Sequence, residues 1–170
     1  MPELNIYSRS RDWRGQILSR FAPTPYVMNG DNGREVRIAS SESFYQGIKF
    51  HEDDPRQDEC FALSGPEAKK FGATAPKDGF VYFGGEPIPF RSTEHRALLK
   101  ESERQKFLQN PDAFEALVQT KNEGLTLVHR IRGRNVGGDF VEIIHELRDE
   151  LVMDGKNELI CMGGISLATM

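Results

Sequence analysis

The sequence has few cysteines and no long apolar run, and each absence excludes a class of protein. Its two cysteines, Cys60 and Cys161, lie far apart and lack the spacing of a metal site. We therefore expect free, buried thiols in a cytoplasmic protein. No stretch approaches the ~18 consecutive apolar residues of a membrane-spanning helix. The start, MPELNIYSRSRDWRG, lacks the apolar centre of a secretory signal, so no membrane partner is expected.

The chain also lacks a basic excess, a repeat and a low-complexity tract. A net charge of -4 argues against broad, sequence-blind binding to a nucleic-acid backbone, although it leaves room for a local basic pocket that holds a phosphate. A length of 170 residues fits a single domain with a real core. We predict one domain over residues 1–170, and the sequence indicates no oligomeric state.

The first half of the chain predicts short elements. Residues 3–40 are typical of loops and short strands, with a hairpin whose arms, YVM and EVRIA, flank the turn signal NGDNG. Ser40 or Ser41 can cap a helix over about 41–52. Short helices are expected near residues 60–63 and from Pro66 to Gly72, and FVYF is typical of a strand.

The second half predicts longer helices. One covers about Thr93 to Leu108, and Asn110 caps the next, whose apolar face is Phe114, Leu117 and Val118. GLTLVHRIRGRN alternates like a strand. In the last helix the apolar residues recur every three or four positions; they are Phe140, Ile143, Ile144, Leu147 and Leu151. MDGKN ends it, and the apolar tail after Met153 matches no pattern.

The segment ASSESFYQGIKFHE (39–52) raises a question of chemistry. As a helix it places Glu42, Gln46 and Lys49 on one stripe, with Gly47 in its interior. Glycine costs ~1 kcal/mol relative to alanine there, which indicates the close approach of another backbone or of a ligand. The first helical turn favours an ionised carboxylate at Glu42. The plainer alternative is a stripe that faces solvent.

Four segments, in order, resemble the NADAR (YbiA-like) family. LSRF (18–21) and ESFYQGIKF (42–50) are similar to the family's LSNF element and EHYFQAQKF-like helix. RQKFLQNPDAFEALVQT (104–120) and GRNVGGDFVEIIHELRDEL (133–151) are similar to its KFxQNPxLxxxLLxT and GxNxLGxxLMxxRxxL segments. The resemblance covers about residues 15–151. It implies a YbiA-like α+β fold that is predominantly helical, with short N-terminal strands.

Members of this family are N-glycosidases. The resemblance therefore implies an enzyme that hydrolyses the C1′–N bond of a phosphorylated ribosyl or ADP-ribosyl compound, either ADP-ribosyl-guanine in nucleic acid or a ribosylamino intermediate of riboflavin synthesis. It places the catalytic glutamate at Glu42 and the family's lysine at Lys49. Asn135 matches the asparagine that opens the late helix, where a plain helix cap is an equal alternative.

The chemistry agrees with these residue types. Cleavage builds positive charge on the sugar, and a fixed carboxylate at Glu42 stabilises that charge and activates the attacking water. Gln46 can donate a hydrogen bond to the departing base. No metal or other cofactor is needed for this reaction.

The remaining candidates are expected to bind the substrate. Lys49, Arg20, Arg91 and Arg134 are candidate phosphate or sugar contacts. Phe21, Phe44 and Tyr45 can stack on the base, with core packing as the alternative for at least two of them.

The chain also departs from the family pattern. Arg20 replaces the asparagine of LSNF, Phe90 and Arg91 stand where the family has DW, and HRIRGRN replaces a WG-type segment. The three arginines of HRIRGRN either bind phosphate or protect an edge strand. These changes keep open an alternative function, a non-catalytic module that binds a nucleotide or ADP-ribose, and a purely structural role.

Overall fold

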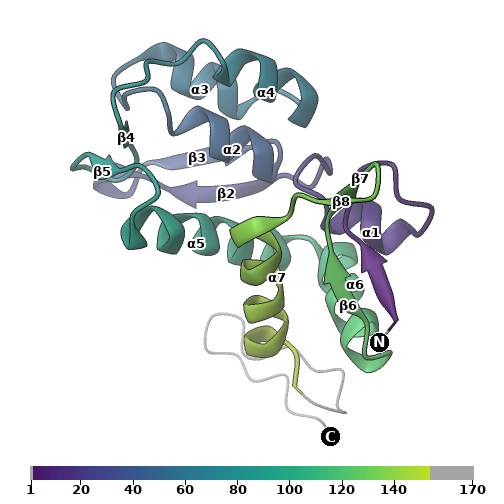
Figure 1. Ribbon diagram of the computed structural model, residues 1–170. Coiled ribbons are helices and arrows are strands. Elements are labelled where there is room, and N and C mark those ends of the chain that lie inside the picture. Colours follow the sequence, from purple (N-terminus) through teal and green to yellow (C-terminus); the bar gives the residue numbers. More distant parts are fainter. Residues whose placement is uncertain (1, 154–170) are drawn as a thin grey trace, which may run out of the picture. The chain divides into compact units, whose positions relative to one another are not determined.

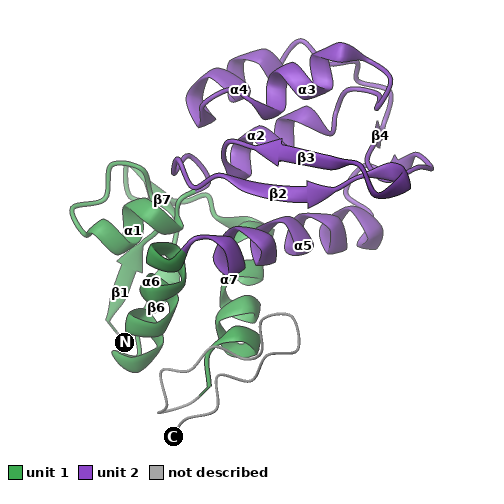
Figure 2. Cartoon of the chain, turned by 180° about the vertical axis from the view of Figure 1, so that it is seen from behind, with its two compact units in different colours: residues 1–19, 111–170 green, residues 20–110 purple. Residues whose placement is uncertain are grey.

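Helices dominate the part of the chain that the structure, a computed structural model, describes, which is residues 2–153 (Figure 1). The expected α+β class with short strands is confirmed. Contacts divide the chain into two compact units, residues 20–110 (unit 2) and residues 1–19 with 111–170 (unit 1), and Figure 2 colours them separately. The single domain predicted from the sequence stays a prediction.

Unit 2 is built on the hairpin that the NGDNG turn predicts. Strands β2 (Tyr26–Asn29) and β3 (Glu35–Ile38) pair antiparallel with Tyr26 opposite Ile38. Their inward side chains alternate as the pleat requires, so that Met28 and Val36 are buried. Figures 1 and 2 show the hairpin between α5 (Thr93–Gln109) on one side and α2 (Ser41–Gly47) on the other.

The other elements of unit 2 are short. Helix α3 (Pro55–Phe61) and helix α4 (Gly65–Gly72) pack on α2, and strands β4 (Phe80–Val81) and β5 (Ile88–Pro89) pair antiparallel. One hydrophobic core of unit 2 joins side chains of the hairpin, α2, α3, β4 and the residues next to them; it comprises Tyr26, Met28, Val36, Ile38, Phe44, Ile48, Phe61, Val81 and Phe83.

Three expectations for unit 2 need correction. Helix α2 ends at Gly47, earlier than predicted, because the amide of Phe50 bonds the Gly47 carbonyl and tightens the last turn. Helix α3 starts at Pro55, where Asp54 caps it by accepting a hydrogen bond from an amide. The strand expected over 80–83 covers two residues.

Unit 1 combines the two ends of the described chain. Strand β1 (Glu3–Asn5) runs parallel to β6 (Thr126–Val128). Helix α6 (Pro111–Asn122) contributes the buried Phe114, Leu117 and Val118, as predicted. Helix α7 (Gly138–Leu151) buries most of its predicted apolar stripe.

One helix of unit 1 was not predicted from the sequence, and one predicted strand is too long. Helix α1 (Trp13–Leu18) is capped by Asp12, whose side chain accepts a hydrogen bond from the amide of Arg14. The strand expected across GLTLVHRIRGRN breaks at His129, after which β7 (Arg130–Ile131) and β8 (Arg134–Asn135) form a separate hairpin.

Cys60 is free and buried, as expected. The predictions for Cys161, the end of MDGKN and the apolar tail lie outside the described residues.

Candidate active site

Glu42 lies buried in the first turn of α2. Ser40 caps the helix by accepting a hydrogen bond from the amide of Ser43, and the amide of Glu42 donates to the Arg20 carbonyl at 3.0 Å. Only 5% of Glu42 is exposed to solvent, and Gln46 is equally buried. The alternative in which this stripe faces solvent is therefore wrong.

Hydrogen bonds connect the stripe along its length. Gln46 donates from Nε2 to Glu42 Oε1 at 2.7 Å, and Lys49 donates from Nζ to Gln46 Oε1 at 2.8 Å. Arg20 pairs with the second carboxylate oxygen, with 3.2 Å between Nε and Oε2. Both oxygens of the buried carboxylate thus have donors, which a buried charge requires.

Tyr45 lies beneath the cations of this cluster. The Arg20 guanidinium carbon is 4.1 Å from its ring centroid, and Lys49 Nζ is 4.8 Å from it. Both distances fall within the range of cation–π attraction. Partial burial lowers the pKa of Lys49, an effect that the charge of Glu42 opposes. Two cations are therefore concentrated beside one anion at the face of an aromatic ring.

His95, in the first turn of α5, is a site residue that the sequence reasoning missed. Its ring stacks on Tyr45 at 6.3 Å and lies 5.2 Å from the Phe90 ring. The Arg91 amide donates to its Nδ1 at 3.0 Å, whereas its buried Nε2 has no hydrogen-bond partner among the described residues. Burial, with the nearby Lys49 charge, lowers the pKa of His95 to about 4, so the ring is neutral near pH 7. No pattern in the sequence indicates that His95 belongs to the site, because a histidine beside a helix cap is common.

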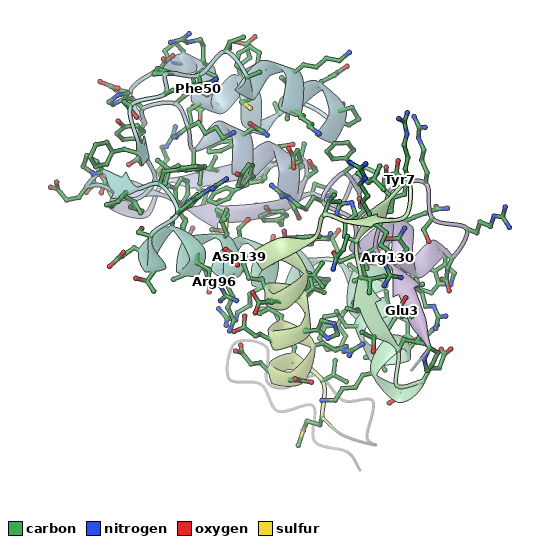
Figure 3. All side chains as sticks on the ribbon, viewed as in Figure 1. Glu3, Tyr7, Phe50, Arg96, Arg130 and Asp139 are labelled. Atoms are coloured by element: carbon green, nitrogen blue, oxygen red, sulfur yellow. The ribbon has the colours of Figure 1, made fainter. Side chains whose placement is uncertain are left out.

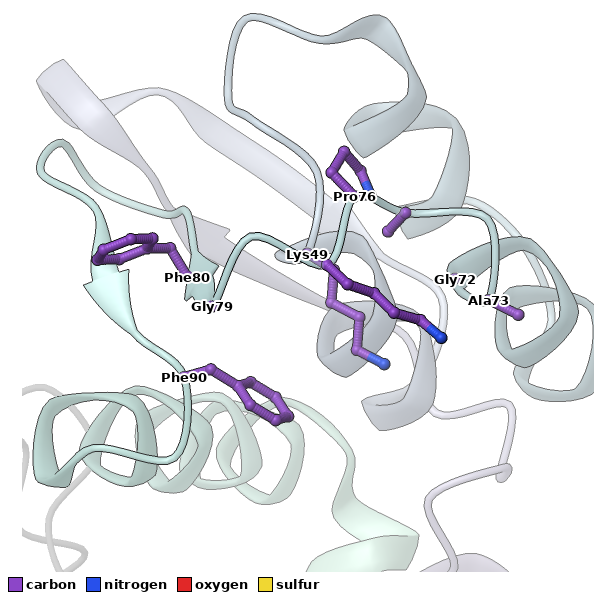
Figure 4. Close-up of a pocket in the computed structure, with 9 residues that line it drawn as sticks. Lys49, Gly72, Ala73, Pro76, Gly79, Phe80 and Phe90 are labelled. Atoms are coloured by element: carbon purple, nitrogen blue, oxygen red, sulfur yellow. The ribbon is translucent and has the colours of Figure 1, made fainter.

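A cavity of about 520 Å³ adjoins this cluster (Figure 4). Lys49 points into it, and Phe80 and Phe90 lie on its other side. The lining is mostly apolar, with two lysines; it comprises Lys49, Gly72, Ala73, Ala75, Pro76, Lys77, Gly79, Phe80 and Phe90. A pocket of this size, with few charged groups, suits a ligand that has a ring and an anionic group.

Two glycines permit the packing of this region. A Cβ on Gly47 would lie 2.4 Å from the Phe61 ring, so the close approach predicted there is that of a core side chain, and the expected backbone or ligand is not the cause. A Cβ on Gly72 would lie 2.0 Å from Gln46 Oε1, the atom that accepts from Lys49. Gly72 therefore leaves the space in which the Gln46 amide is held.

A second buried pair of charged groups lies in α5. Glu103 and Lys106 are 5% and 0% exposed. Burial raises the pKa of Glu103 and lowers that of Lys106, while each group opposes the shift of the other. Arg20 and Glu42 also influence the pKa of Glu103, so this pair adjoins the Glu42 cluster.

The other predicted residues of unit 2 have different surroundings. Phe21 lies against α4, with Lys69 Nζ 5.8 Å from its ring centroid. Arg91 is exposed, has a left-handed φ of 64°, and holds its guanidinium 5.4 Å from the Phe90 ring. The structure thus brings together Arg20, Glu42, Tyr45, Gln46 and Lys49, and joins Arg91 to them through its amide and His95.

Arg134 and Asn135 belong to unit 1. Both are exposed in β8, and the Asn135 Oδ1 accepts a hydrogen bond from the Gly137 amide at 3.2 Å. The N-cap of α7 is Gly137 and no side chain caps this helix, so the alternative in which Asn135 is a plain helix cap is wrong.

Among residues 2–153, no group of three or more side chains has the arrangement of a metal site. No helix in this part of the chain is long and apolar enough to cross a membrane.

Comparison with known proteins adds a family and a fold. The model of the family described as bacteriophage protein GP30.3 matches residues 12–154. The NMR structure of the E. coli protein YbiA is similar to 88% of this chain and 84% of its own, with a TM-score of 0.61 and 21% identity. No curated protein matches. The expected YbiA-like fold is confirmed.

Proposed function

This chain belongs to the bacteriophage protein GP30.3 family, a NADAR-type family, and on that premise we propose that it is an N-glycosidase. Its substrate is a phosphorylated ribosyl or ADP-ribosyl compound, in which it hydrolyses the C1′–N bond. The observation that carries the proposal is the buried Glu42 carboxylate, held by Gln46 and Arg20 beside a cavity into which Lys49 points.

Glu42 is proposed as the catalytic residue. Loss of the base leaves positive charge on the sugar ring, and a carboxylate that is already fixed stabilises this charge without reorganising. The same oxygen pair can accept a proton from the attacking water. Gln46 donates one amide hydrogen to Glu42 and has a second for the substrate.

The neighbouring groups are proposed to bind. Lys49 and Arg20 attract the phosphate. Both cations lie over the Tyr45 ring, and the base of the substrate can stack on the same ring. Phe90 and Phe80 replace the aromatic wall that the family has in its DW segment, because they line the cavity. Arg91 and Phe21, at the edge of these groups, are proposed as outer contacts.

A second function is favoured by one observation. Both Glu42 oxygens already have donors, and Glu42 is not among the residues that line the cavity. A protein with this arrangement can bind a nucleotide or ADP-ribose without cleaving it.

One experiment separates the two functions. Ribosyl and ADP-ribosyl compounds are incubated with wild-type protein, Glu42→Gln and the control Glu35→Gln, which changes an exposed strand residue. Release of the base is followed by mass spectrometry, and binding by the shift in Tm. If the protein is an N-glycosidase, Glu42→Gln is expected to lower turnover by about 10³-fold or more, while the affinity for the compound changes little.

The outcomes are distinct. Glu35→Gln is expected to keep wild-type turnover. Wild-type activity in Glu42→Gln would remove Glu42 from the chemistry. A ligand that raises Tm without release of any base from any compound would assign the second function.

A further inference from the structure

His95 has a buried hydrogen-bond donor that no group in the described part of the chain accepts. The Arg91 amide donates to Nδ1 at 3.0 Å, so Nδ1 offers a lone pair and has no proton. Burial, with the nearby charge of Lys49, lowers the pKa of His95 to about 4, and the ring is neutral near pH 7. Its one exchangeable proton therefore lies on Nε2, which is buried and has no hydrogen-bond partner among residues 2–153.

The two aromatic rings beside His95 do not accept this proton. An N–H bond lies in the plane of the imidazole, so it points at the face of a neighbouring ring only when the two planes are nearly perpendicular. The plane of His95 makes an angle of 19° with that of Tyr45 and 37° with that of Phe90. The Nε2 proton is therefore directed at neither ring face.

Packing alone does not explain a histidine at this position. His95 is 3% exposed, and a buried donor without an acceptor lowers stability. A phenylalanine would pack against the same two rings without a buried donor. Arg91, whose amide fixes the ring, has a left-handed φ of 64°, which is unfavourable for arginine. An unpaired donor that is held in place at a cost in stability is explained by an acceptor that comes from outside the chain.

His95 lies at the wall of the cavity in unit 2. The Phe90 ring lines this cavity, and its centroid is 5.2 Å from that of His95. Lys49, whose charge acts on His95, points into the same cavity (Figure 4). Nε2 is covered in the structure, and Phe90 is 37% exposed, so rotation of the Phe90 side chain can open the wall. A planar ring in the cavity then has its edge beside His95.

We propose that His95 Nε2 donates a hydrogen bond to the base of the ligand, at a carbonyl oxygen or an unprotonated ring nitrogen on its edge, and that Phe90 swings aside to admit it. This contact selects against a base that turns an amino group to His95, because two donors would then face each other. The anionic group stays with Lys49 and Arg20, since cations attract it more strongly than a neutral imidazole does. The inference rests on the proposed function, in which a base occupies this cavity.

The contact can be tested by calorimetric titration of the full chain with inosine, adenosine and uridine 5′-monophosphate. These are phosphorylated ribosyl compounds whose bases all have acceptors on their edges. His95→Phe keeps an aromatic ring and removes the donor, so it is expected to weaken the tightest of these complexes by about tenfold or more. His95→Gln can donate from its side-chain amide near the position of Nε2, so its affinity is expected to stay within about threefold of wild type.

NMR of the wild type at pH 7, with isotopic label in its histidines, gives a readout that a structural role would not change. The signal of His95 is the one that is missing in His95→Gln. In the free protein it should be that of the Nε2–H tautomer. On saturation with the nucleotide, the Nε2 proton should move downfield and exchange more slowly with water. This measurement decides the proposal even if His95→Phe does not fold.

Glu94→Gln is the matched control, because Glu94 is exposed in the same turn of α5. It should change affinity less than twofold, and equal Tm values should show that the variants fold. Absence of binding of all three nucleotides, unchanged affinity in His95→Phe, or an Nε2 proton that does not shift overturns the proposal. An equal loss in His95→Gln and His95→Phe also overturns it, because the site would then need the shape of the imidazole and not its donor.

This assay can fail independently of the proposed reaction, because it needs no hydrolysis. If the nucleotides bind with the expected contrast and no compound releases its base, the His95 contact stands and the N-glycosidase does not. If Glu42→Gln loses turnover while His95→Phe binds like the wild type, the N-glycosidase stands and the contact does not.

Discussion

The two units of this protein differ in how deeply their charged side chains are buried. Every buried aspartate, glutamate, histidine, lysine or arginine within residues 2–153 belongs to unit 2; these are Glu42, His95, Glu103 and Lys106. In unit 1 the ion pairs Arg14–Asp12 and Arg130–Glu3 join side chains that are 12–40% exposed. Buried charges are strengthened by a low dielectric and are suited to chemistry, whereas exposed charges are screened and are suited to attracting a large anion.

The largest expected effect comes from breaking the buried pair of α5. In Lys106→Met the Glu103 carboxyl loses its opposite charge in a site without solvent. We expect the free energy of unfolding to fall by about 3–5 kcal/mol, measured by urea denaturation.

Lys70→Met, which changes an exposed lysine of α4, is the control and should cost under ~1 kcal/mol. Combining Lys106→Met with Glu103→Leu should restore much of the loss, because no charge then remains buried. Equal losses of stability in Lys106→Met and Lys70→Met would show that burial of the Glu103–Lys106 pair adds nothing to its effect on stability.

A smaller effect is expected in the pH dependence of stability. The pKa of His95 is about 4 in the folded protein and near its ordinary 6.5 when unfolded. Between these values the unfolded chain binds a proton that the folded chain does not, so stability falls as pH drops from 6.5 towards 4. At pH 4.5 this loss is about 2–3 kcal/mol relative to pH 7.

His95→Gln should remove that part of the dependence, because glutamine does not titrate. Urea denaturation at pH 7 and 4.5 measures it, with the wild type compared at each pH so that other titrations cancel. An unchanged pH dependence would mean that the ring takes up its proton freely in the folded state.

The smallest effect is expected at the surface of unit 1. Figure 3 labels Arg130 and Glu3, which form an ion pair in which each side chain is 40% exposed. Arg130→Ala should lower the free energy of unfolding only slightly, since such pairs are screened by water and salt. Raising the salt concentration should reduce this difference, whereas a cost comparable to that of Lys106→Met would contradict it.

The predicted parts of the fold are those with a local signal. NGDNG predicted the position of the β2–β3 turn, Ser40 caps α2 as expected, and α5 begins at the predicted Thr93. The stripe of Glu42, Gln46 and Lys49 followed from helical spacing, and its connected hydrogen bonds agree with that spacing. Helix α1 was missed because six residues give no readable period.

The burial of charge could not be predicted from spacing. Glu103 and Lys106 lie three residues apart, a spacing that is also typical of an ion pair on an exposed helix face. Their burial depends on where α5 packs in the fold. The same holds for His95, whose partners Tyr45 and Phe90 come from other segments. Tertiary contacts decide these surroundings, and a single sequence contains no direct signal for them.

The order of the chain through the two units bears on biosynthesis. Unit 2 is one uninterrupted stretch, residues 20–110, so a ribosome delivers all of its core before α6 exists. Strand β1 must wait for β6, because Glu3 pairs with Thr126. Closing so long a loop is slow, and a folded insert shortens the span that the ends must search. The buried cluster around Glu42 can therefore form during translation, whereas the β1–β6 pair of unit 1 is completed only after Val128 has emerged.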